Sequence, residues 1–156
     1  MKTYVRTVHM MLLVAIALLV PARFLTAQPA AVSAMIVSFD MGGSIQSRQT
    51  EVRKLRRTGQ RVEIIGRCYS ACTMYLGLSN VCVAPNAVLG FHGPKGVAGS
   101  LASDVFDHWS QVMARNMRKP LQVWFMQHAR HVRSGVLKVS GSTLINMGYA
   151  RCQITS

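Results

Sequence analysis

The sequence predicts a single α/β domain built on a mainly parallel β-sheet. Short apolar runs alternate with longer amphipathic segments along the chain, and this alternation is typical of sheets whose strands are joined by helices. The chain has 156 residues, which is room for one domain, and its 50% hydrophobic content is ample for a packed core. We expect the domain to span residues 34–156.

Four short apolar runs in the first half of the domain are predicted to be strands. They cover residues 35–39, 62–65, 81–84 and 88–91. Residues 44–58 form a predicted helix, because Ile45, Val52 and Leu55 recur at near-helical spacing. Gly59 ends this helix, since glycine adopts a left-handed cap at little cost. A second helix is expected over residues 70–78.

The second half of the domain is predicted to be mainly helical. Residues 101–117 and 121–133 form two helices separated by Lys119 and Pro120, and proline is favoured in the first turn of a helix. A short helix around residues 142–147 ends at Gly148, and a last strand covers residues 150–154.

The N-terminus has the layout of a secretory signal. Lys2 and Arg6 precede an apolar run from about residue 10 to 20, and small residues follow at Ala27 and Ala30. We expect cleavage after Ala27 or Ala30, which would release the domain into the periplasm or the medium. An uncleaved membrane anchor is the alternative, although the run is shorter than the roughly 20 residues that span a bilayer.

Four cysteines accompany this export segment, and in an oxidising compartment an even number indicates disulfides. Three pairings are open. We prefer Cys68 with Cys72, which would staple the turn that presents Ser70, and Cys82 with Cys152. A zinc site using Cys68, Cys72 and His92 does not match the common ligand spacings, so we expect no metal and no cofactor.

The formal net charge is +13, and loss of Lys2, Arg6 and Arg23 with the export segment lowers it by three to +10. Such a surplus attracts polyanions or anionic membrane surfaces. Much of it lies in one stretch, which we interpret as a solvated helix face rather than a binding patch. Nucleic acid is not expected as a partner, because the chain is exported and this stretch lacks interleaved aromatic residues. The basic residues of the stretch are Arg48, Arg53, Lys54, Arg56, Arg57, Arg61 and Arg67.

Three polar motifs each follow a predicted strand. Ser70 opens a helix, where free N–H groups favour negative charge, although an ordinary helix cap is the simpler interpretation. Gly42 and Gly43 could aim a backbone N–H at a developing oxyanion. His92 is a candidate base directly after the strand over residues 88–91. Because ligand sites lie at the carboxyl ends of parallel strands, we expect the three motifs to converge.

The order of these motifs resembles the proteolytic subunit of Clp protease and its exported relatives in the crotonase-like superfamily. The resemblance covers about residues 35–94 and, more loosely, residues 139–150. It implies a fold of repeated β-β-α units around a mainly parallel sheet. The motifs that carry it are Asp40-Met41-Gly42-Gly43-Ser44-Ile45, Cys68-Tyr69-Ser70-Ala71-Cys72 and the segment from Ala84 to Gly90-Phe91-His92-Gly93-Pro94.

The resemblance also implies the roles of single residues. Ser70 would be the nucleophile, His92 the general base, and the N–H groups of Gly43 and Ala71 the oxyanion hole. The activity implied is that of a serine hydrolase, a peptidase in particular, with a peptide or protein substrate extended beside residues 43–45. Family members assemble into rings, which implies a homo-oligomer, whereas an exported chain has no ATP supply and no ATPase partner is implied.

One departure from the family concerns its orienting aspartate. The corresponding position falls near Ser134, Gly135 and Val136, none of which is acidic. The third member of the triad is therefore unknown, with Asp40 and Ser134 as weak candidates. The alternative function is a catalytically inactive binding or scaffold protein with the same fold.

Two further groups of residues have simpler interpretations. His128 and His131 could share a metal on one helix, but no third ligand is evident and a solvated basic face is favoured. The aromatic residues Trp109, Trp124 and Phe125 are expected in the core rather than at an oligomer contact.

Overall fold

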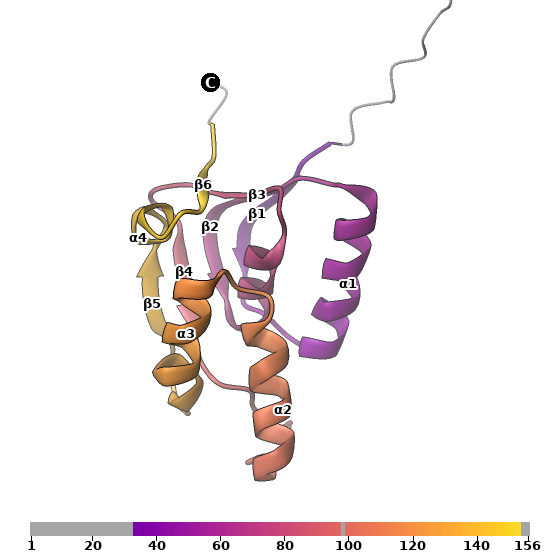
Figure 1. Ribbon diagram of the computed structural model, residues 1–156, viewed down its shortest axis with the longest axis vertical. Helices are drawn as coiled ribbons and strands as arrows, with labels where there is room; N and C mark the ends of the chain where they lie inside the picture. Colours follow the sequence, from indigo (N-terminus) through magenta and orange to yellow (C-terminus); the bar gives the residue numbers. More distant parts are fainter. Residues whose placement is uncertain (1–32, 98, 154–156) are drawn as a thin grey trace, which may run out of the picture. The chain divides into compact units, whose positions relative to one another are not determined.

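The computed structural model describes residues 33–97 and 99–153, and within them the chain is a mixed α/β domain with a mostly parallel, curled sheet (Figure 1). The expected signal segment, with cleavage after Ala27 or Ala30, lies outside these residues, as does Ile154 at the end of the last predicted strand. The strands are β1 (Met35–Asp40), β2 (Val62–Tyr69), β3 (Val81–Val83), β4 (Val88–Phe91), β5 (Leu137–Ser140) and β6 (Ala150–Arg151). The helices are α1 (Ile45–Thr58), α2 (Ser103–Ala114), α3 (Lys119–Gln127), α4 (Gly141–Asn146) and the 3₁₀ helices η1 (Ser70–Gly77) and η2 (Ala129–His131).

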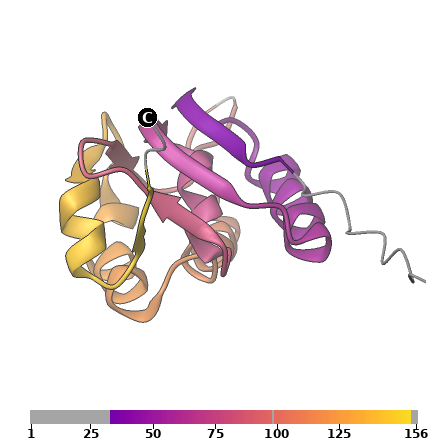
Figure 2. The same ribbon diagram turned by 90° about the horizontal axis from the view of Figure 1, so that it is seen from above.

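Strand β2 is the centre of the sheet. It pairs in parallel with β1 along one edge, and on its other edge first with β3 and then with β4. In Figure 2 the indigo strand β1 lies beside the magenta strand β2. Strand β6 adds to β3 in parallel, and β5 adds to β4 in the antiparallel direction. Every described pairing except that between β4 and β5 is parallel, as the sequence predicts.

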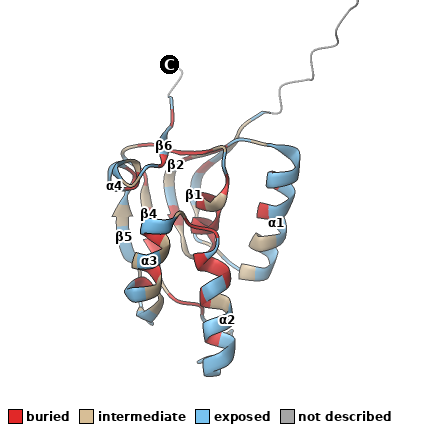
Figure 3. Cartoon of the chain, viewed as in Figure 1, coloured by how far each residue is buried: buried red, intermediate tan, exposed pale blue. Residues whose placement is uncertain are grey.

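Helix α1 confirms the sequence prediction at both of its ends. The Ser44 hydroxyl accepts a hydrogen bond from the Ser47 N–H at 3.3 Å, and Gly59 closes the helix with φ +66°. Val52 and Leu55 are buried on the side that packs against η1, while most of its arginines are exposed (Figure 3). The amphipathic pattern therefore predicted this helix correctly.

Strand β5 is the element that the sequence did not reveal. Its residues Leu137 to Ser140 are exposed or only partly buried, so they lack the apolar run that marks a buried strand. The other predicted strands and helices are present with shifted ends. Strand β2 continues to Tyr69, four residues beyond its predicted end, and the helix predicted over residues 121–133 divides at His128, whose dihedrals leave the helical region.

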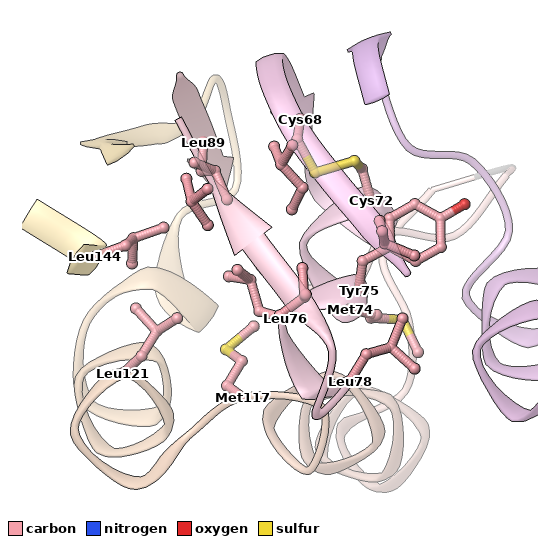
Figure 4. Packing of buried hydrophobic residues seen from close by; sticks show 14 of the residues in the cluster. Cys68, Cys72, Met74, Tyr75, Leu76, Leu78, Leu89, Met117, Leu121 and Leu144 are labelled. Atoms are coloured by element: carbon pink, nitrogen blue, oxygen red, sulfur yellow. A yellow bond between two sulfur atoms is a disulfide. The ribbon is translucent and has the colours of Figure 1, made fainter. Parts of the chain in front are cut away.

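The hydrophobic core lies between the sheet and the helices, and η1 runs through it. Six consecutive residues of this 3₁₀ helix, from Ala71 to Leu76, are buried. In Figure 4, Leu76 of η1 lies on the side of Leu89 of β4, Leu121 of α3 and Leu144 of α4, while Met74 and Tyr75 lie on the side of Leu78 and Cys72. Because η1 begins directly at the end of β2, the position of Ser70 is fixed by the best-packed part of the domain.

The cysteines form the preferred pairs. Cys68 at the end of β2 bonds to Cys72 in η1, and Cys82 in β3 bonds to Cys152 just after β6. The sulfur atoms of Cys68 and Cys72 are therefore not available as zinc ligands. Two disulfides indicate an oxidising, extracytoplasmic environment. Within residues 33–97 and 99–153, no helix is both long enough and apolar enough to cross a membrane.

The two disulfides should differ in their contribution to stability. Cys82 and Cys152 are 70 residues apart, whereas Cys68 and Cys72 are four apart. Chain entropy gives about 4 kcal/mol for the long loop and about 2 kcal/mol for the short one. We expect Cys82→Ala/Cys152→Ala to lose more unfolding free energy than Cys68→Ala/Cys72→Ala in urea titrations. All four cysteines are buried, so packing losses are similar, and the opposite ranking would contradict the argument.

Candidate active site

The three polar motifs meet at the carboxyl edge of the sheet. The strand registers align Asp40, Cys68 and Leu89 in one row across β1, β2 and β4, and each motif follows within two or three residues. Gly43, Ser70 and His92 line one cleft of about 370 Å³. Ile45 of α1 and Trp109 and Met113 of α2 complete its apolar walls. The convergence that the sequence predicted is therefore present in the fold.

Ser70 has an unusual backbone conformation. Its φ is +57°, the only positive value among the described residues other than glycine. Tyr69 occupies the cap position of η1, so the interpretation of Ser70 as an ordinary N-cap is wrong. Strand β2 passes into η1 with no intervening loop, and this sharp turn requires the left-handed conformation. Such conformations cost about 1–3 kcal/mol and are common at functional sites.

Three contacts hold the Ser70 turn in place. The Cys68–Cys72 disulfide joins the residue two positions before Ser70 to the residue two positions after it. The buried Thr73 hydroxyl donates to the Ser70 carbonyl at 2.8 Å. A Cβ on Gly42 would lie only 2.6 Å from Ser70 Cβ, so the glycine packs directly against the turn.

The Gly42-Gly43 loop lies next to the amide of Ala71. Gly42 approaches Ala71 N so closely that a Cβ there would be 3.0 Å away, and Gly43 lines the cleft with φ +114°. Ala71 is the second residue of η1, so its N–H has no partner inside the helix. Ala71 itself is fully buried beside the cleft rather than lining it. The loop that contains Gly43 thus packs beside the Ala71 amide, the other group expected in the oxyanion hole.

Arg48 fastens this loop to the rest of the domain, a role that the sequence did not reveal. Its guanidinium pairs with Asp40 at 2.6 Å, donates to the Gly42 carbonyl at 3.3 Å and bonds the hydroxyl of Tyr75. The side chain is only 11% exposed. Arg48 therefore does not belong to the solvated face predicted for the basic stretch; its position, eight residues after Asp40, follows no periodic pattern that would have signalled the contact.

His92 is held by the carbonyl of the next residue. Its Nδ1 lies 2.6 Å from the Gly93 oxygen. Because a carbonyl can only accept, the neutral ring carries its proton on Nδ1 and leaves the Nε2 lone pair free. Gly93 is itself fixed, since a Cβ there would lie 2.0 Å from the Arg130 carbonyl.

The environment of His92 favours the neutral imidazole. Burial of the ring lowers its pKa below the ordinary value of about 6.5, the Gly93 hydrogen bond raises it, and the positive charge of Lys95 lowers it further. The net shift is downward. At neutral pH the ring is therefore in the form that can accept a proton.

Ser70 and His92 share the cleft without a hydrogen bond to each other; the hydrogen bonds of the described residues join His92 to Gly93 alone. Catalytic hydrogen bonds are often long in structures without substrate and tighten when it binds. The arrangement brings the candidate nucleophile and the candidate base to one cavity.

No carboxylate takes the place of the family's aspartate among the described residues. Both oxygens of Asp40 are occupied, by the Gly42 N–H and by Arg48. Ser134 is exposed in the loop before β5. The register of β4 with β5, continued by one residue, sets Val136 opposite His92, and valine cannot accept a hydrogen bond. The remaining acids are Glu51, paired with Arg48; Glu63, paired with Arg61; Asp107, paired with Arg130; and the exposed Asp104.

The other candidate residues have structural positions. Phe125 is buried, Trp124 packs edge-on against Phe91 with ring centroids 5.4 Å apart, and Trp109 lies partly in the core. His128 and His131 are exposed. The described residues contain one cluster of metal-ligand types, Glu63 with Cys82 and Cys152, but its sulfur atoms are joined in a disulfide.

Comparison of the chain with protein-family models and with curated proteins found no match.

Substitution of the two loop glycines should separate backbone strain from the contact with Ser70. Gly42 and Gly43 have similar φ values of +103° and +114°, but an added Cβ meets Ser70 and the Tyr69 carbonyl only at Gly42. We expect Gly42→Ala to lose about 1 kcal/mol or more of unfolding free energy beyond the loss in Gly43→Ala, because overpacking adds to the shared backbone cost. Equal losses in urea titrations would show that the loop does not press on the Ser70 turn.

Proposed function

We propose that the protein is an exported serine hydrolase, specifically a peptidase, that acts through Ser70 and His92. One observation carries the proposal: a left-handed serine and a histidine with a free Nε2 lie in the same cleft. The proposal includes the fold of repeated β-β-α units of crotonase-like proteins and a location in the periplasm or the medium. Homo-oligomers and peptide or protein substrates remain expectations from the resemblance.

The mechanism follows from the roles of the individual atoms. His92 Nε2 takes the proton of Ser70 Oγ as the oxygen attacks a substrate carbonyl. The N–H groups of Gly43 and Ala71 donate to the oxyanion of the tetrahedral intermediate. The imidazolium then protonates the leaving amine and an acyl-enzyme forms on Ser70. Water, deprotonated by His92, hydrolyses this ester and restores the serine.

The Gly93 carbonyl performs part of the work of the absent aspartate. It fixes the tautomer and the direction of the imidazole, which are two of the three contributions that a triad carboxylate makes. A neutral carbonyl stabilises the imidazolium less than a carboxylate does. We therefore expect slower turnover than a complete triad would give, with the order of steps unchanged.

The alternative is a binding or scaffold protein that has the same fold and no turnover. The absence of a carboxylate at His92 favours it, since removal of the triad acid can lower turnover by about 10⁴-fold. The backbone conformation of Ser70 fits both functions, because a scaffold protein with the same fold has the same turn from β2 into η1. The neutral His92 in the same cleft is the feature that favours a hydrolase.

A fluorophosphonate probe should label the full-length exported protein at Ser70. We expect Ser70→Ala to abolish labelling and His92→Ala to slow it by about 10²-fold or more, the usual size of a general-base effect. Ser79→Ala is the matched control, because Ser79 is exposed just past the far end of η1 and should leave labelling intact. Mass spectrometry of the labelled peptide identifies the site, and folded protein without label would favour the scaffold alternative.

The rate of labelling should depend on pH through His92. The neutral ring is the base, so the rate rises with pH and reaches half its maximum below pH 6.5, because burial lowers the His92 pKa. Lys95→Gln removes a charge that disfavours the imidazolium, so the pKa rises and the midpoint moves to higher pH. Lys54→Gln, an exposed change on α1, should leave the midpoint in place. A Lys95→Gln midpoint that stays or falls would contradict this assignment.

A further inference from the structure

The cleft beside His92 continues into a second hollow. This hollow has a volume of about 440 Å³ and shares Pro94, Lys95 and Leu101 with the cleft that contains Ser70. Arg133, from the segment between η2 and β5, lines its far part. A substrate long enough to pass Pro94 would therefore extend from the reacting atoms into this second space.

Two cations without acidic partners line the second hollow. None of the ion pairs among the described residues includes Lys95 or Arg133. Arg133 packs over the ring of Phe106, 4.0 Å from the ring centroid, and this contact holds the guanidinium beside the hollow. Lys95 also lines the cleft that contains Ser70 and His92, which places it near the reacting centre.

No acidic residue lines either space. The five acids of the chain lie elsewhere, and four of them are already paired with arginines. The charged side chains that line the two spaces are therefore both cations, and a cleft lined by one sign of charge concentrates ligands of the opposite sign. Arginine also accepts a carboxylate with two parallel hydrogen bonds, a geometry that lysine complements as a point charge.

We propose that the site takes acidic peptides, with a Glu or Asp side chain of the substrate bound in the second hollow by Lys95 and Arg133. This assignment of a substrate class rests on the proposed peptidase function. It assigns substrate specificity to Lys95 and Arg133, which lie outside the three motifs of the proposed active site. A peptide with lysine at the same position meets two like charges there, so the site discriminates by repulsion as well as by attraction.

Binding to the Ser70→Ala protein tests the proposal without turnover. Three fluorescent peptides, alike except for a central Glu-Glu, Gln-Gln or Lys-Lys pair, are titrated by anisotropy at low and at physiological salt. We expect the order Glu, then Gln, then Lys, with a difference between Glu and Gln peptides that shrinks as salt is added.

Substitutions then assign the preference to the hollow. Lys95→Gln/Arg133→Gln should lower affinity for the Glu peptide by about threefold to tenfold, the size expected for loss of two exposed ion pairs, and should leave the Gln peptide unchanged. Lys54→Gln/Arg57→Gln removes the same two charge types from the exposed face of α1 and is the matched control. Equal losses of affinity in both double variants would show that the preference arises from the net charge of the chain, and would overturn the proposal.

The labelling and binding experiments distinguish the acidic-substrate assignment from the peptidase function. Ser70 labelling with no preference for the Glu peptide overturns the acidic-substrate assignment and leaves the hydrolase intact. A Glu preference that depends on Lys95 and Arg133, in a protein that no probe labels, supports the acidic-peptide site and rejects the peptidase.

Discussion

Strand β2 forms ladders with three other strands, and the positions of the site residues follow from it. Its edges are occupied by β1 on one side and by β3 and β4 on the other, and the chain leaves the sheet directly after Tyr69. Ser70 makes that exit with a positive φ, and η1 then runs directly into the core. Because β1 and β4 are registered on the same strand, Gly43 and His92 come to the same edge. The strain at Ser70 is sustained by the packing of η1 on one side and the disulfide on the other.

The contacts around the site are mostly between backbone and small residues. Glycine at positions 42 and 93 allows neighbouring chain segments to approach more closely than a side chain would permit. Arg48 connects the loop after β1 to α1 and η1 through one partly buried guanidinium. Arg48 forms ion pairs with Asp40 and Glu51, and other arginines form ion pairs with Glu63 and Asp107. The internal use of scarce acids leaves the positive charges at the cleft without partners, which connects the stability of the fold to the charge of its site.

In the proposed mechanism, His92 acts without a triad carboxylate. A carboxylate orients the imidazole and stabilises its charge, whereas the Gly93 carbonyl supplies orientation with little charge stabilisation. Burial and Lys95 both act against the imidazolium, so His92 is readily available as a base but gives a less stable protonated intermediate. For the proposed hydrolase, this balance would favour acyl transfer from activated carbonyls.

The sequence left three cysteine pairings open, but by itself it determined the α/β class, the ends of α1 and the three motifs that follow β1, β2 and β4. These features depend on local patterns, such as apolar periodicity, capping residues and glycine, which involve residues close together in the sequence. It did not reveal β5, because an edge strand buries too little surface to require an apolar run. Only the tertiary structure decided that Ser70 is left-handed, that Asp40 pairs with Arg48, and that the His92 ring meets the Gly93 carbonyl. The Ser70 turn depends on its packing against the Gly42 loop, and the Asp40 pair depends on the approach of α1 to the end of β1. The His92 contact joins adjacent residues, but it depends on the orientation of the ring, which no periodicity along the chain encodes.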